Sequence, residues 1–266
     1  MPSIDKIHSI LELLRKYYKT GLTNKEISSA LNIPPSTCYR ILASLKKYDY
    51  IYQRKSDMRY FLGFAHLRFA ESVIESVDAA AICLPYLEDL HRETEETVFF
   101  ALYNGKQCVA MEVCGYINTR ISVGRGEIMP MHCASSGKAV LAFLPEREKK
   151  RYIYESELKA YTKNTIIDPA RLEENIKEIY RTGVAYNFQE FNNGINAMST
   201  PIFDSQNRVI GALTVVGTSV DLDEQQMKEY SEQFLEASIE ISNKLGAEFP
   251  PWIIENLKKQ GSLVIK

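Results

Sequence analysis

A pair of prolines inside residues 31–53, LNIPPSTCYRILASLKKYDYIYQ, constrains the fold more than any other feature of this chain. A residue that precedes a proline avoids the α region, so Ile33 and Pro34 end one helix. Pro35 suits the first turn of the next helix. One face of that helix is apolar, with Cys38, Ile41, Leu42, Leu45 and Tyr48. The other face is polar, so the pattern predicts two helices joined by a tight turn, the second of which exposes a polar surface.

The neighbouring segments complete a small domain. Residues 5–18 have the apolar period of a helix, and Gly21 would end it. Thr23 and Glu26 have the spacing of a capping box, which starts a second helix. The inward residues of this second helix would be Ile27, Ala30 and Leu31. Residues 50–52 and 59–62 are short β-rich runs around a polar turn and predict a hairpin. Three helices and a hairpin predict a winged helix-turn-helix domain over residues 1–62.

The charge of the chain is unevenly distributed. Residues 1–62 contain eleven Lys and Arg against five Asp and Glu, a net charge of +6. The rest of the chain contains twenty-one basic and twenty-nine acidic residues, a net charge of −8, which together make the total of −2. A basic segment on an acidic body predicts a polyanionic partner for the first domain alone.

The polar face of the third helix has the residue types that read DNA. The first turns of a recognition helix enter the major groove, and Arg40 can bind a guanine edge through two hydrogen bonds. Basic residues of the hairpin suit phosphate contacts, which add affinity without sequence information. The predicted partner is a double-stranded DNA operator. The predicted contact residues are Ser36, Thr37, Tyr39, Arg40, Ser44, Lys47, Arg54, Lys55 and Arg59. The alternative is a winged-helix module that binds protein.

The remainder of the chain predicts an α+β domain. Residues 63–78 read as a linker helix, and residues 79–246 as an antiparallel sheet flanked by helices. Asn104-Gly105 between two apolar runs is a strong hairpin signal. Helices are predicted at 80–94, 136–144, 146–158, 169–182 and 223–245, and strands at 196–204 and 208–217. Residues 247–266 are left as a C-terminal tail.

Composition limits the location and the cofactors. Five cysteines are scattered along the chain, which argues against a disulfide framework and predicts a cytoplasmic protein. The sequence shows no apolar run long enough to span a membrane and no signal peptide pattern. The spacing of Cys108, Cys114, His132 and Cys133 fits no zinc finger or ribbon, so no metal or cofactor is predicted.

One short motif raises an enzymatic alternative. Ser135 and Lys138 have the S-x-x-K spacing of penicillin-recognising hydrolases, in which the serine is the nucleophile. The S-D-N motif is absent, and Lys19-Thr20-Gly21 lies before the motif in the wrong domain. The better interpretation is a helix start at which Gly137 allows close packing, and a protein that is not an enzyme.

Several blocks together resemble a known family. IPPSTCYRILASLKKYDYI and RYFLG resemble the DNA-binding half of the IclR family of bacterial transcription regulators. PMHCASSGKAVLAFLPE resembles the signature of its effector-binding half, and NTIIDPARLEENIKEIYRTGVAYNFQE and GINAMSTPIFDSQNRVIGALTVVG extend the resemblance almost to residue 245. The resemblance implies a GAF-like small-molecule sensor and a homodimer or homotetramer. The apolar face of residues 64–77, with Ile7 and Ile10, is either dimer surface or core.

The resemblance also implies an effector pocket. Carried over to this chain, its residues are Met129, Ser135, Ser136, Asn187, Ile195, Ala197, Thr214 and Val216. Asn187 stands where some members have an acid, and Ala197 stands where a cysteine is common. Because of these departures, the resemblance does not identify the ligand. The family expectation is a small organic or aromatic acid, held by the N–H groups where Ser135 and Ser136 open a helix. The predicted function is a transcription regulator, such as a repressor, whose DNA binding is controlled by that effector.

Overall fold

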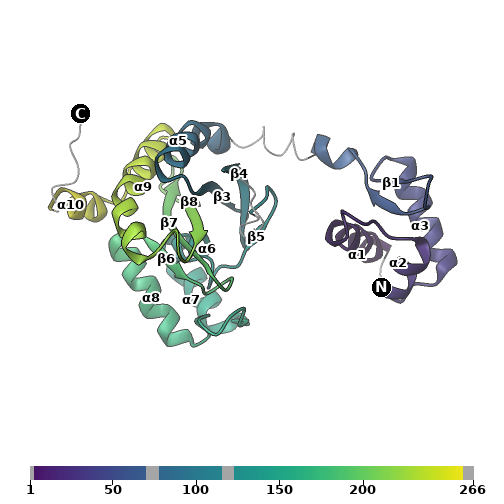
Figure 1. The fold of residues 1–266 in the computed structure, drawn as a ribbon. Coiled ribbons are helices and arrows are strands. Elements are labelled where there is room, and N and C mark those ends of the chain that lie inside the picture. The colour runs from purple at the N-terminus through teal and green to yellow at the C-terminus, as the bar shows by residue number, and fades with distance from the viewer. Residues whose placement is uncertain (1–2, 70–77, 116–122, 260–266) are drawn as a thin grey trace. The chain divides into compact units, whose positions relative to one another are not determined.

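The computed structural model describes residues 3–69, 78–115 and 123–259. The chain divides into two compact units, Met1–Ser76 and Val77–Lys266 (Figure 1). Residues 65–69 are helical, and the larger part of the predicted linker helix, residues 70–77, lies outside the described residues. Among the described residues, no helix is both long enough and apolar enough to cross a bilayer.

Unit 1 is a winged helix-turn-helix, as predicted. Its elements are α1 (Ser3–Lys16), α2 (Asn24–Leu31), α3 (Pro35–Lys47), β1 (Ile51–Gln53) and β2 (Tyr60–Leu62). The strands β1 and β2 form an antiparallel hairpin. Thr23 caps α2 in the predicted capping box with Glu26, and Pro35 occupies the first turn of α3. These local signals were readable because they depend on residues three or four apart.

The core of unit 1 corrects some details of the prediction. The helix α1 ends at Lys16, and Gly21, at φ +64°, follows a separate turn in which its N–H donates to Tyr17 O. Ile10 is fully buried and belongs to the core. Ala30 and Tyr48 are exposed rather than inward, and Ser28 is buried in place of Ala30. A helix of only eight residues buries a narrow stripe, so its apolar period is a weak guide.

Unit 2 is built on a six-stranded antiparallel sheet in the order β5-β4-β3-β8-β7-β6. The strands are β3 (Thr97–Tyr103), β4 (Cys108–Cys114), β5 (Ile128–Met129), β6 (Ala185–Phe188), β7 (Ile195–Phe203) and β8 (Val209–Thr218). The helices are α5 (Asp78–Thr94), α6 (Ser135–Phe143), α7 (Glu146–Glu155), α8 (Pro169–Thr182), α9 (Glu224–Lys244) and α10 (Pro251–Lys259). The predicted α+β class is confirmed.

Helices cover both faces of the sheet (Figure 1). The helices α5 and α9 contact each other and the sheet, and α9 reaches β7 through Thr200, whose hydroxyl lies 2.5 Å from Ser238 Oγ. The helix α6 lies against the other face, where Ser199 donates to Ser135 Oγ at 2.8 Å. Thr200 and Ser199 are neighbours on β7, so their contacts follow the alternation of side chains along a strand. The helix α8 packs against α6, and α7 packs against α8.

The Asn104-Gly105 pair lies in a hairpin loop, as predicted, but the loop is longer than two residues. Tyr103 pairs with Cys108, so residues 104–107 form the loop. Gly105 has φ +88°, and the Asn104 side chain accepts hydrogen bonds from the N–H groups of Lys106 and Gln107. The asparagine therefore acts as a local turn acceptor rather than as a residue with positive φ.

The predicted C-terminal tail is part of unit 2 as far as residue 259. Phe249 and Ile253 are buried. Trp252 Nε1 donates to Tyr180 O at 3.1 Å, and Asn256 Nδ2 donates to Arg181 O at 3.3 Å. These bonds satisfy carbonyl groups in the last turn of α8. The segment docks on α8 because its apolar side chains are buried there. The sequence of the segment alone does not indicate this partner.

Candidate functional site

The turn before α3 is held by side chains of α2. Ser28 Oγ donates to Ile33 O at 2.6 Å, and the N–H of Ile33 donates back to Ser28 O at 3.0 Å. Asn32 adopts φ +50°, a left-handed conformation that asparagine tolerates. Asn24 Nδ2 also donates to Pro35 O, at 3.4 Å. The start of α3 is therefore held in a defined orientation relative to α2.

The structure places the predicted α3 contact residues on its outer side. Cys38, Leu42 and Leu45 are buried under the helix. The side chains of Ser36, Tyr39, Arg40, Ser44 and Lys47 are exposed, and Thr37 is half-buried. The outer face combines hydroxyl groups, a guanidinium group and an ammonium group, which are the donors that base edges and phosphates accept.

The wing residues differ in how free they are. Lys55 is exposed at the tip of the hairpin. Arg54 pairs with Asp57 across the turn at 2.6 Å, and its guanidinium lies over the Phe61 ring. Arg59 is bound within the fold.

Arg59 donates to Gly21 O at 2.9 Å and to both carboxylate oxygens of Glu26 at 3.0 Å. Glu26 also belongs to the capping box of α2. The hydrogen bond from the backbone N–H of Thr23 lowers the pKa of Glu26 most, and Arg59 lowers it further. Arg59 therefore ties the wing to the start of α2, a role in the fold that its predicted phosphate contact did not include.

In unit 2, the structure brings all eight predicted effector residues around one cavity. The cavity has a volume of about 70 Å³. Apolar walls come from Met129, Ile195, Ala197 and Val216, and polar groups from Ser135, Ser136, Asn187 and Thr214. Further lining residues that sequence reasoning missed are Phe99, Val123, Glu127, Ala134, Phe191 and Asn192. Phe99 reaches the cavity because β3 pairs with β8 and places Phe99 opposite Thr214, a long-range contact that the sequence pattern does not indicate.

The polar groups of this cavity are not equivalent. Ser199 connects Ser135 and Thr214 through hydroxyl contacts of 2.8 Å each. Asn187 donates to Cys133 O and accepts from the N–H of Glu190, both at 2.8 Å. The Asn187 amide is thus occupied in joining the loops of the cavity. Ser136 Oγ is buried and has no hydrogen-bond partner among the described residues, so it is a donor available to a ligand.

The N-terminus of α6 opens at this cavity. Its N-cap is Ala134, which has no capping side chain, so the first N–H groups of the helix lack that partner. A Cβ on Gly137 would lie 2.3 Å from Pro130 O, so only glycine permits this close approach, as predicted. A helix N-terminus with free donors favours an anionic group.

The S-x-x-K motif is arranged differently from that of a hydrolase. Lys138 Nζ lies 2.5 Å from Glu190 Oε1, and both residues are buried. Burial lowers the pKa of Lys138 and raises that of Glu190. Ser135 Oγ accepts from Ser199 instead of facing the lysine. Within the described ranges, no three or more His, Cys, Asp or Glu side chains cluster in a way that could hold a metal ion.

Comparison with known proteins identifies the family. Residues 3–55 match the IclR helix-turn-helix domain. Residues 71–243 match the family described as bacterial transcriptional regulator IclR C-terminal. The chain belongs to the IclR family. Its members are transcription regulators and not enzymes, which agrees with the predicted class.

Curated and solved IclR-family relatives cover nearly the whole chain. The HTH-type transcriptional regulator KipR of Bacillus subtilis is 27% identical over 86% of this chain and 92% of its own length. The HTH-type transcriptional repressor AllR of Klebsiella pneumoniae is 27% identical over 92% of this chain and 93% of its own. The crystal structure of the Thermotoga maritima IclR is 28% identical and covers 93% of this chain and all of its own, with a TM-score of 0.76.

Proposed function

We propose that this IclR-family chain binds one operator sequence and that a small organic acid in the unit 2 cavity controls that binding. The proposed DNA binding is supported by the outer face of α3, on which Arg40, Ser44 and Lys47 are exposed. The opposite face of the helix is packed into the core through Cys38 and Leu42. Exposed polar side chains on a rigidly held helix are what direct readout in the major groove requires.

The predicted DNA contacts divide into two classes. Ser36, Thr37, Tyr39, Arg40 and Ser44 would read bases or adjacent phosphates from α3, and Lys47, Arg54 and Lys55 would contact phosphates. Arg59 would contribute through the orientation of the wing, because Glu26 and Gly21 already bind its guanidinium. Repression is the proposed direction of control, since AllR carries that description in its name.

The effector cavity favours a small aliphatic acid over an aromatic one. An engineered protein cavity of about 150 Å³ binds benzene, and this cavity is smaller, at about 70 Å³. The ligand carboxylate would accept hydrogen bonds from the N–H groups at the start of α6 and from Ser136 Oγ, and Met129 and Val216 would contact its carbon atoms. No bond in the ligand would be broken.

We further propose that the active form is a homodimer or a homotetramer. Phe64, Leu67 and Phe69, which are close in sequence, are 76%, 65% and 53% exposed, and an exposed apolar patch is typical of an interaction surface. One recognition helix covers few base pairs, and two-fold pairing doubles the contact. Effector binding would then shift the population between two arrangements of the paired DNA-binding units.

Fluorescence anisotropy tests the proposal. The probe is the DNA upstream of the gene for this chain, the competitor is random DNA, and the titration is done at two salt concentrations. Specific, salt-sensitive binding supports an operator-binding regulator. Weak binding of equal affinity for every sequence contradicts the proposal that this DNA contains the operator. No binding at low salt favours the protein-interaction module. Repeating the titration with acetate, glycolate, propionate and lactate tests control by a small aliphatic acid.

A further inference from the structure

A second and larger cavity lies in unit 2. It measures about 400 Å³, within the range of ligand pockets. The lining comes from the tip of the β3–β4 hairpin, from Ile128 and residues 130–132, from Leu144, and from α7 with the residues that follow it. Pro130 and His132 line this cavity, whereas Met129 and Ala134 line the effector cavity. The two cavities therefore lie on either side of one short segment.

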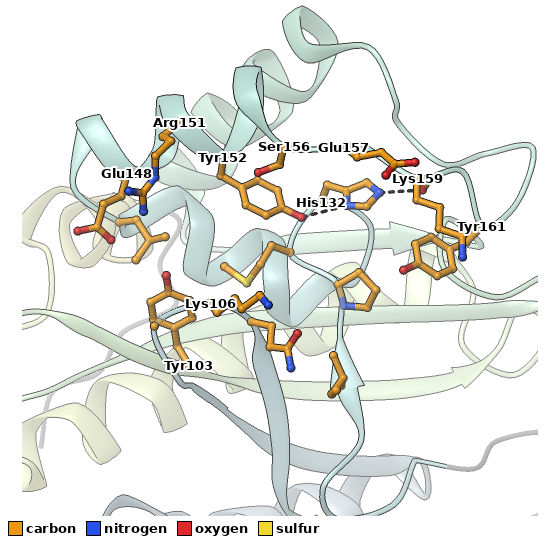
Figure 2. A pocket seen from close by; sticks show the side chains of 16 residues that line it. Tyr103, Lys106, His132, Glu148, Arg151, Tyr152, Ser156, Glu157, Lys159 and Tyr161 are labelled. Atoms are coloured by element: carbon orange, nitrogen blue, oxygen red, sulfur yellow. Dashed lines mark hydrogen bonds between the residues drawn. The ribbon is translucent and has the colours of Figure 1, made fainter. Parts of the chain in front are cut away.

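The charges of this lining favour a single negative charge on a ligand. Its cations are Lys106, Arg151 and Lys159, and its carboxylates are Glu148 and Glu157, so with a neutral His132 the net charge is +1. No ion pair within 4.0 Å joins any of these five side chains to another described residue. Figure 2 shows Arg151 at one end of the lining, Lys159 at the other, and Lys106 between them.

His132 and Tyr152 give the cavity a fixed inner wall. His132 Nε2 lies 2.9 Å from Lys159 O, and Nδ1 lies 3.2 Å from the Tyr152 hydroxyl (Figure 2). A carbonyl oxygen only accepts, so Nε2 carries the proton and Tyr152 donates to Nδ1. Burial lowers the pKa of His132 and raises that of Tyr152 to about 12, so both rings are neutral near pH 7.

Three tyrosines contribute flat rings to the lining, beside the aliphatic side chains of Ile128, Pro130, Met131 and Leu144. Tyr103 lies on one side and Tyr161 on the other, and the Lys159 ammonium lies 5.4 Å from the centre of the Tyr161 ring. Aromatic side chains favour the stacked or edge-on approach of another ring. The cavity is also well above the volume of about 150 Å³ that holds benzene, unlike the effector cavity.

We propose that this cavity is a second ligand site, for an aromatic compound that carries one carboxylate. The carboxylate pairs with Lys106 and Arg151, and the ring lies among Tyr103, Tyr152 and Tyr161. The site does not depend on the proposed DNA binding or on the proposed effector.

Isothermal titration of the full chain with 2-naphthoate tests the site, since a bicyclic ring is too large for the effector cavity. We expect saturable binding, and binding about tenfold weaker for the neutral 2-naphthamide. Lys106→Gln and Arg151→Gln should each raise the Kd by about tenfold. Lys163→Gln is the matched control, because Lys163 is exposed outside the lining and should bind as the parent chain does.

A variant of the effector cavity separates the two sites. Ala197→Leu adds three carbon atoms to the effector cavity and should leave 2-naphthoate binding unchanged. The proposal is overturned if no saturable binding occurs, if the two lining variants bind 2-naphthoate as tightly as the parent chain does, or if Ala197→Leu loses binding. DNA binding by the same protein preparations, measured by fluorescence anisotropy, tests the proposed regulator function independently of the ligand site.

Discussion

Lys138 Nζ lies 2.5 Å from Glu190 Oε1, with side-chain exposures of only 1% and 8%. The pair joins α6 to the loop after β6, next to the effector cavity. Glu190 O also accepts hydrogen bonds from Thr165 at 2.6 Å and Thr162 at 3.2 Å. The ion pair is therefore one part of the contacts that hold residues 162–165, residues 187–190 and α6 together.

Breaking this pair should destabilise unit 2 strongly. Lys138→Met or Glu190→Leu alone leaves one buried charge without a partner, which costs about 3–5 kcal/mol of unfolding free energy. The double variant removes both charges and should recover most of that loss. Urea unfolding of the four proteins gives the coupling. Additive losses in the double variant would show that packing, and not charge pairing, determines the cost.

His132 should make the stability of unit 2 depend on pH. Burial lowers the pKa of the folded His132, so the ring binds a proton more readily in the unfolded chain. Its contribution to stability is present above an unfolded pKa of about 6.5 and is lost as the pH falls through the folded pKa.

The Tm measured from about pH 7.5 to about pH 5.5 checks this dependence. His132→Gln should lose less on acidification than the parent chain. The control is His8→Gln, because His8 is exposed. If the Tm of the parent chain and that of His132→Gln depend equally on pH, other titratable groups cause the dependence.

Arg40→Ala and Lys55→Ala should weaken DNA binding in different ways. In the proposed complex Arg40 reads bases, so its loss should cost about 1–3 kcal/mol and relax sequence preference. Lys55 is proposed to contact phosphate, so its loss should weaken binding to all DNA sequences equally and reduce the salt slope by about 1. Anisotropy against matched and altered sites distinguishes them. A uniform effect of Arg40→Ala would contradict base readout.

Ser136→Ala should affect ligand binding without affecting stability. The Ser136 hydroxyl has no hydrogen-bond partner within the described part of the chain, so its removal breaks no bond in the fold. Binding of the small carboxylate that the titration selects should weaken by about 1 kcal/mol.

Ser242→Ala is the contrasting control. Ser242 Oγ accepts from Phe203 N at 3.1 Å, so this variant should lose about 1–3 kcal/mol of stability. Unchanged carboxylate affinity in Ser136→Ala would place the ligand elsewhere.

The docking of α10 should be visible in the fluorescence of Trp252, the single tryptophan of the sequence. Ile253 is fully buried, so Ile253→Ala should cost about 2–5 kcal/mol. Release of α10 would move Trp252 into water and shift its emission to longer wavelength. Glu255→Ala is the control, since Glu255 is exposed. A destabilised variant with an unshifted spectrum would show that α10 stays docked.

Much of unit 1 follows from local sequence. The capping box of Thr23 and Glu26 and the position of Pro35 depend on neighbouring residues, and both were predicted. The failures there concern burial: Tyr48 and Ala30 were assigned to the core and are exposed. Which side of a short helix is covered depends on what packs against it, and the period alone does not identify that partner.

The sequence by itself determined the winged helix-turn-helix, the α+β class and the family, because capping, proline positions and characteristic blocks are properties of short segments. Only the tertiary structure decided that Lys138 meets Glu190, that Arg59 binds Glu26, and that residues 130–132 line a second cavity. These partners are up to 52 residues apart. Their meeting depends on how α6, β6 and the wing pack, and a long-range contact leaves no periodic signal in the chain.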